Sequence, residues 1–297
     1  MTIDSPHPSA THGRLCILLA SLMWSTSGAF AKVLTQPTGF GLDEPKVEPL
    51  QMAFYRALFA ALVLIPLLRP ADLRWRLPML PMVLCFAVMN ATFVSALALG
   101  TAANAIVLQY TAPVWMYLAC VWLLGEPADN RSLVACGIAV VGIVVIVAGG
   151  WSGDQFPAVK LGLVSGLTYA AVMVFLRMLN DVSSTWLTFM NHFVSALVLI
   201  PFVYHLAMPS WPQMAVLFVY GAVQMSVPYW LVARGVRSVS PQEAGTITLT
   251  EPILNPFWTF LVAGEQPAGY ELIGGAFIVG ALAWRYWPRK RPVLSEL

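Results

Sequence analysis

The side chains of this sequence that could do chemistry are few, because almost everything around them is apolar. Glu251 is a carboxylate within a long apolar stretch, four positions before Asn255. A charge in apolar surroundings is costly unless it is paired or wetted, so such a residue indicates a functional site by default. Two roles stay open for Glu251. It could carry a proton or meet a substrate, or it could be a hydrogen-bonded prop beside Pro252.

Two prolines lie in matching surroundings. Pro113 ends the segment TAANAIVLQYTAP, and Pro252 ends the segment SPQEAGTITLTEP. Inside a helix, each proline removes a backbone donor and frees the carbonyl four residues earlier, at Gln109 and Thr248. Paired helix breaks in the two halves of a membrane chain indicate a substrate site and a gating role. A packing kink satisfied by threonine hydroxyls is the alternative, and the two are compatible.

Aromatic, amide and hydroxyl residues in the middle of apolar stretches form the third group. We expect the aromatic rings to provide walls for a large apolar group, and the amides and hydroxyl to meet ammonium and carboxylate groups. For any one aromatic residue, packing against lipid or another helix is the alternative. The predicted substrate-binding residues are Trp24, Asn90, Tyr110, Tyr169, Gln224, Tyr229 and Thr246.

For two further polar residues, a structural role is favoured over a role in the site. Arg56 lies about two turns from the end of its apolar stretch, where its long side chain is expected to snorkel toward the membrane surface. His192, next to Asn191, is expected to be a packed histidine. No second embedded histidine is present to pass it a proton.

The composition identifies an integral membrane protein. The chain is 59% hydrophobic and 10% charged, whereas soluble domains are about one quarter charged. A net charge of +2 does not suggest a nucleic-acid partner. The cysteines stand singly in apolar runs and are interpreted as small buried hydrophobes, so we expect no metal and no cofactor. The polar segment 1–13 lacks a basic n-region, which argues against a cleaved signal peptide.

The positioning elements are membrane-spanning helices, each of which needs about 20 mostly apolar residues. This criterion predicts an all-α fold of ten spans, at approximately 14–34, 50–68, 78–99, 102–124, 132–149, 159–179, 185–206, 213–234, 241–263 and 269–287. With the N-terminus in the cytoplasm, twelve Lys and Arg residues fall at cytoplasmic ends and three at outer ends. The positive-inside rule therefore predicts that both termini, including the tails 1–13 and 288–297, are cytoplasmic.

The sequence repeats itself, which indicates a duplication. ALVLIP occurs at 61–66 and again at 196–201, and the two proline segments align at an offset of 139. A Gly-Glu pair follows each of them, at Gly125-Glu126 and Gly264-Glu265, and at an offset of 145 Trp24 and Lys32 match Tyr169 and Arg177. Five spans per repeat place the second repeat upside down, so we expect two inverted five-helix repeats at 14–149 and 159–287.

On these features the chain resembles the EamA-type drug/metabolite transporter superfamily, over roughly residues 14–287. Trp24-Ser25, Tyr110-Thr111-Ala112-Pro113 and Tyr229-Trp230 are most similar to the YddG-type amino-acid exporters. The resemblance implies export of aromatic and other neutral amino acids across the bacterial inner membrane, by alternating access. It places the central cavity between spans one, three, four, six, eight and nine. The alternative is efflux of drugs or metabolites by the same fold.

The expected partners are an amino-acid substrate and the lipid bilayer, and we expect a monomer. An enzyme is not expected, since HExxH, GxSxG and Walker motifs are absent from the sequence. Small multidrug exporters of the superfamily carry a glutamate in their first helix, but span one here has no Asp or Glu. This favours facilitated transport. Proton coupling through Glu251 is the alternative.

Overall fold

The computed structural model describes residues 10–122, 125, 127, 129–151, 154–236, 238–239 and 241–287. These residues form helices joined by short connectors, and no strand occurs among them. The predicted all-α membrane fold is confirmed. The first helix begins at Ala10, inside the segment expected as an N-terminal tail. The expected C-terminal tail, 288–297, and Glu126 of the first Gly-Glu pair lie outside the described residues.

The helices follow one another with few long connectors. Their bounds are α1 (Ala10–Trp24), α2 (Ser27–Thr35), α3 (Pro49–Leu64), α4 (Met79–Leu99), α5 (Ala102–Gln109), α6 (Ala112–Trp122), α7 (Asn130–Gly150), α8 (Phe156–Met178), α9 (Ser184–Val203), α10 (Trp211–Gly221), α11 (Val227–Gly235), α12 (Pro241–Thr248), α13 (Thr250–Ala263) and α14 (Gly269–Tyr286). Short turns η1 (Ile65–Leu67) and η2 (Pro70–Asp72) follow α3, and the π-helical turn η3 (Ala222–Ser226) joins α10 to α11.

The membrane spans correspond to single helices or to pairs of consecutive helices. Eight segments of the described chain are long and apolar enough to cross a bilayer, from Ala10–Thr35 to Trp211–Gly235. The α12–α13 pair and α14 then lie where spans nine and ten were expected. The count is therefore consistent with ten.

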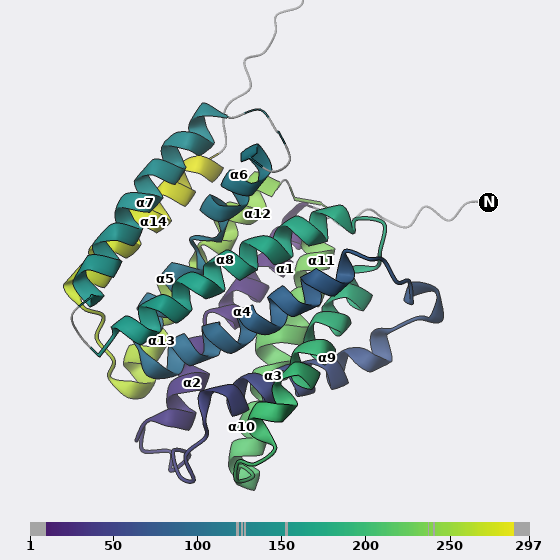
Figure 1. The fold of residues 1–297 in the computed structure, drawn as a ribbon, viewed down its shortest axis with the longest axis vertical. Coiled ribbons are helices and arrows are strands. Elements are labelled where there is room, and N and C mark those ends of the chain that lie inside the picture. Colours follow the sequence, from purple (N-terminus) through teal and green to yellow (C-terminus); the bar gives the residue numbers. More distant parts are fainter. Residues whose placement is uncertain are drawn as a thin grey trace, which may run out of the picture.

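Close helix packing holds the bundle together. The helices α7 and α14 run side by side along one edge (Figure 1). Their backbones approach closely, since a Cβ atom added at Gly142 would lie 2.5 Å from the Gly274 carbonyl oxygen. Small residues of this kind allow membrane helices to pack without a hydrophobic driving force between them. On the other side of the bundle, α4 contacts α8 and α9, and α3 packs on α9.

Several spans are interrupted partway through the bundle. Helix α5 ends at Gln109 and α6 begins at Ala112, while only Leu249 separates α12 from α13. Tyr110 and Leu249 are 139 positions apart (249 − 110), which is the offset of the repeated segments. The first span also breaks, between Trp24 and Ser27, and span eight contains the π-helical turn η3. The sequence indicated only the breaks next to prolines.

Candidate functional site

The broken helices enclose a cavity of about 240 Å³. Its walls combine aromatic rings, methionines and a few polar side chains. They include the spans that the family resemblance implied, together with span two through Arg56 and span ten through Tyr286. The lining residues are Trp24, Arg56, Met89, Phe93, Gln109, Tyr110, Ala112, Pro113, Met116, Tyr169, Met173, Gln224, Met225, Tyr229, Thr248, Glu251 and Tyr286.

One wall of this cavity is built where two helix breaks meet. The Tyr110 hydroxyl lies 2.8 Å from Oε2 of Glu251 and 2.9 Å from the carbonyl oxygen of Thr248. Tyr110 follows the end of α5, and Glu251 lies in the first turn of α13. The hydroxyl therefore serves the carbonyl that Pro252 leaves without a helical donor. A carboxylate in the first turn of a helix is also favoured by the helix dipole.

Aromatic rings form the sides of the cavity. Trp24 and Tyr229 meet edge to face, with ring centroids 5.5 Å apart at 74°. Tyr169 lines the same cavity from α8, and Tyr286 lines it from α14. Such a lining suits an apolar or aromatic group of a small ligand. The four aromatic residues among the predicted binding residues, Trp24, Tyr110, Tyr169 and Tyr229, are thus brought together.

Arg56 corrects the sequence interpretation. Its side chain was expected to snorkel to the membrane surface, but it is 1% exposed and points inward to line the cavity. Its Nη2 lies 2.5 Å and its Nε 3.2 Å from Asn90 Oδ1, and its Nη1 lies 3.2 Å from both Tyr220 Oη and Gln224 Oε1. Three buried acceptors hold the guanidinium at this depth. Snorkelling is the usual outcome for an arginine that finds no such partners inside the protein. Arg56 is the main functional candidate that sequence reasoning missed.

The two predicted amides, Asn90 and Gln224, accept hydrogen bonds from this arginine. Asn90 is fully buried and does not line the cavity, and its Nδ2 donates to the Ala53 carbonyl at 2.9 Å and to Ser195 Oγ at 3.0 Å. Gln224 lines the cavity, while its Nε2 donates to the Trp24 carbonyl at the first helix break, at 2.7 Å. Both side chains therefore position Arg56.

The remaining predicted residues do not all line the cavity. Pro113 lines the cavity near the start of α6, and Pro252 is buried in α13 next to Glu251. Thr246 is not a lining residue, and its hydroxyl lies 3.4 Å from the Tyr286 carbonyl. His192 is fully buried and packs edge-on against the Phe86 ring, at 4.9 Å between centroids, which agrees with a packed histidine.

A second cavity of about 480 Å³ continues toward one end of the bundle. It shares Trp24, Tyr169, Met173, Tyr229 and Thr248 with the first. It extends to residues where helices finish or begin, among them Leu67, Asn180 and Ser184. The two cavities are therefore neighbours that share part of their walls.

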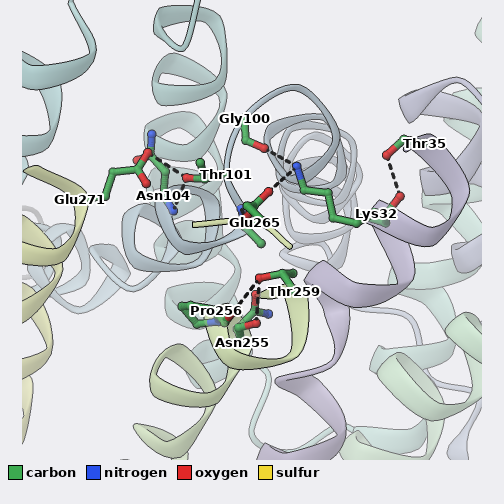
Figure 2. Close-up of polar contacts among 12 residues, drawn as sticks. Lys32, Thr35, Gly100, Thr101, Asn104, Asn255, Pro256, Thr259, Glu265 and Glu271 are labelled. Carbon is green, nitrogen blue, oxygen red and sulfur yellow. Dashed lines mark hydrogen bonds and ion pairs between the residues drawn. The ribbon is translucent and has the colours of Figure 1, made fainter. Parts of the chain in front are cut away.

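A buried ion pair lies at the opposite end of the bundle. The Lys32 Nζ of α2 lies 2.7 Å from Glu265 Oε2, and it donates to the Gly100 carbonyl at 2.6 Å (Figure 2). Glu265 Oε1 accepts from the Ala102 backbone N–H at the start of α5, at 2.7 Å. Both side chains are almost fully buried. The pair joins α2, the α4–α5 turn and the α13–α14 turn.

The same end carries a second buried carboxylate. Thr101 Oγ1 donates to Glu271 Oε1 at 2.8 Å (Figure 2). Glu271 Oε2 accepts from the Ala268 backbone N–H at 3.0 Å. Hydrogen bonds thus satisfy both carboxylates of this end without a metal. In the described part of the chain, no three His, Cys, Asp or Glu side chains are placed to hold a metal ion.

Comparisons with known proteins agree with this architecture. Residues 11–148 and 156–286 match the EamA-like transporter family. A protein of Archaeoglobus fulgidus named as an uncharacterized transporter is 28% identical over 283 residues, which cover 92% of this chain and 97% of that protein. A solved crystal structure matches with a TM-score of 0.63 at 19% identity, covering 92% of this chain and 96% of its own. At that identity the structural likeness shows the fold alone.

Proposed function

The chain belongs to the EamA-like transporter family, and from this premise we propose that it exports aromatic and other neutral amino acids across the bacterial inner membrane. In this proposal the substrate binds in the 240 Å³ cavity and crosses by alternating access, down its own gradient. The sequence resemblance to YddG-type exporters supports this choice of substrate.

The observation that carries the proposal is an aromatic cavity with a carboxylate in its wall. Trp24, Tyr169 and Tyr229 offer ring faces and edges to an apolar side chain. Glu251 offers an oxygen acceptor to an ammonium group, and the Tyr110 hydroxyl fixes the direction in which its carboxylate points. The cavity lies at helix breaks, where membrane transporters commonly bind substrate.

The two ends of the bundle support alternating access. The buried Lys32–Glu265 pair joins three elements at one end, while the second cavity adjoins the site on the side of the other end. The distribution of basic residues supports a cytoplasmic position for the Leu67 end. This arrangement suits loading from the cytoplasm, and release requires the Lys32 end to open. The helix breaks beside Tyr110 and Leu249 are suitable hinges.

Counterflow in proteoliposomes tests the proposal. Wild-type protein is expected to exchange labelled phenylalanine for unlabelled neutral amino acids. Trp24→Ala should lose most of this exchange, because Trp24 lines both cavities. Trp122→Ala is the matched control, since Trp122 is 77% exposed on α6 and lines neither cavity.

Efflux of drug-like organic cations or other metabolites is the second candidate. The buried carboxylate Glu251 favours it, because a carboxylate also attracts cations that lack an acidic group. The same vesicles decide between the two candidates. Transport of an organic cation, together with no exchange of any amino acid, would replace the first proposal with the second.

A further inference from the structure

Arg56 is a buried cation with neutral partners only. Its guanidinium contacts one amide oxygen of Asn90, one of Gln224 and the hydroxyl of Tyr220. No carboxylate forms an ion pair with it among the residues that the structure describes. The rings of Phe93 and Tyr220 lie 5.7 and 5.1 Å from its Cζ and add cation–π attraction. Within the described part of the chain, this positive charge at membrane depth is therefore without an ion-pair partner.

The hydrogen-bonding capacity of Arg56 is not fully used. A guanidinium has five N–H donors. Nε makes one bond, Nη1 makes two and Nη2 makes one, so one N–H of Nη2 is left. The bonds that are made fix the orientation of the group, since Asn90 and Gln224 are themselves tied to backbone carbonyls. The result is a rigid, positively charged group in the cavity wall.

We infer that Arg56 binds the carboxylate of the transported solute. A single remaining N–H and a single positive charge match a monoanion better than a phosphate dianion, which would bring excess charge and more acceptors. Glu251 lines the same cavity and complements the other end of a zwitterion. The inference rests on the proposed function in one respect, which is that this cavity is the site where substrate binds.

The first test varies the ligand and leaves the protein unchanged. Detergent-solubilised wild type is titrated calorimetrically with phenylalanine, phenylalanine methyl ester, 3-phenylpropionate and phenethylamine. Phenylalanine and 3-phenylpropionate, the two ligands with a carboxylate, are expected to bind. The ester, which keeps the ring and the ammonium group, should bind about tenfold or more weakly than phenylalanine, as expected for loss of a charge-assisted hydrogen bond. Equal binding of ester and acid would overturn the inference, and so would no binding of either carboxylate.

The second test varies the arginine. Arg56→Gln should weaken the binding of 3-phenylpropionate relative to that of phenethylamine, whereas Arg56→Lys keeps the charge and should keep the wild-type ratio of the two affinities. Arg76→Gln is the matched control, because Arg76 is outside both cavities in an exposed pair with Asp181. A folded Arg56→Gln protein that keeps the wild-type ratio of the affinities for 3-phenylpropionate and phenethylamine would overturn the inference. The ligand series on wild type gives the answer if Arg56→Gln does not fold.

These measurements also separate this inference from the proposed function. Arg56-dependent binding of 3-phenylpropionate, without exchange of any amino acid in vesicles, would support the role of Arg56 and refute amino-acid transport. Exchange of phenylalanine and its methyl ester at equal rates would support amino-acid transport and refute the role of Arg56 in binding the carboxylate.

Discussion

At the scale of single residues, the cavity combines one carboxylate with one guanidinium. Glu251 is oriented by the Tyr110 hydroxyl at 2.8 Å, and Arg56 is oriented by Asn90 and Gln224. Each charge is held by neutral hydrogen-bonding groups rather than by the other charge. The polar residues around the cavity are therefore mostly supports, and the two ionisable side chains are the groups free to act on a solute.

Replacing Glu251 tests its proposed contact with the substrate ammonium group. Glu251→Gln keeps an oxygen for the Tyr110 hydroxyl, so the wall should stay in place. Phenylalanine is expected to bind about tenfold more weakly, and 3-phenylpropionate, which has no ammonium group, should bind as before. Isothermal titration measures both ligands.

The control for this prediction is Glu243→Gln, since Glu243 forms a partly exposed ion pair with Arg14 away from the cavity. If Glu251→Gln weakened both ligands equally, its effect would be structural, and a direct contact with ammonium would be excluded.

Sequence reasoning found the aromatic part of the site and missed its cation. Trp24, Tyr110, Tyr169 and Tyr229 were predicted from their position in mid-span, and all of them line one cavity. Arg56 was assigned to the surface because a lone arginine near a helix end usually snorkels. Its acceptors are 34 to 168 positions away along the chain. Its position as the one basic residue well inside a predicted span was a signal that could have been weighted more.

At the scale of helices, the breaks have different physical causes. Pro113 and Pro252 explain the interruptions beside them, because proline cannot donate to the preceding turn. The break after Trp24 has no proline, and side chains from α13 stabilise it. Asn255 Nδ2 donates to Ser27 Oγ at 2.8 Å, and Trp258 Nε1 donates to Ser25 Oγ at 2.9 Å. Such tertiary contacts cannot be inferred from local sequence.

The buried Lys32–Glu265 ion pair is expected to stabilise its end of the bundle. Lys32→Met leaves the Glu265 carboxylate buried without its cation, which typically destabilises a protein by about 3–5 kcal/mol. Arg76→Met breaks the exposed Arg76–Asp181 pair and should cost only about 0–1 kcal/mol. Thermal unfolding in detergent is expected to show a clear loss for Lys32→Met alone. Equal melting temperatures for the two variants would show that the buried Lys32 pair contributes no more to stability than the exposed Arg76 pair.

Helix α8 must pass close to the break between α5 and α6. A Cβ atom at Gly166 would lie 2.5 Å from Thr111 Oγ1 and 2.6 Å from the Leu108 carbonyl oxygen. Gly166→Ala should therefore destabilise the bundle by about 1–3 kcal/mol through overpacking. Gly280→Ala is the matched control, because nothing lies within 4 Å of its added Cβ. A melting temperature for Gly166→Ala at or above that of Gly280→Ala would contradict the close approach.

At the scale of the whole molecule, apolar length alone predicted the all-α fold and most of its spans. Boundaries shifted by a few residues, as at the first span, which runs over Ala10–Thr35 instead of 14–34. The second cavity toward one end and the buried ion pair at the other end could not be predicted. They depend on contacts such as Lys32 with Glu265, which are 233 positions apart (265 − 32).

The inverted duplication that the sequence predicts has a consequence for topology. Two five-span repeats return the chain to its starting side, so reporter tags fused to the N- and C-termini should both be cytoplasmic. The twelve-to-three distribution of basic residues gives the same orientation. Protease or label accessibility in intact cells and in inverted vesicles measures it. Labelling of either tag from outside intact cells would refute the two inverted repeats.

Energy coupling is the last property that belongs to the molecule as a whole. Among the described lining residues of the central cavity, Glu251 is the one carboxylate, and its repeat mate is Ala112. The first span, which carries the coupling glutamate in small multidrug exporters, has no Asp or Glu. A proton and a substrate therefore have no symmetric pair of carboxylates to exchange on, and an imposed pH gradient should not drive accumulation of phenylalanine in proteoliposomes. Counterflow with and without the gradient, on wild type and Glu251→Gln, measures this. Concentrative uptake that follows the gradient and disappears in Glu251→Gln would establish Glu251 as a proton carrier and end the facilitative proposal.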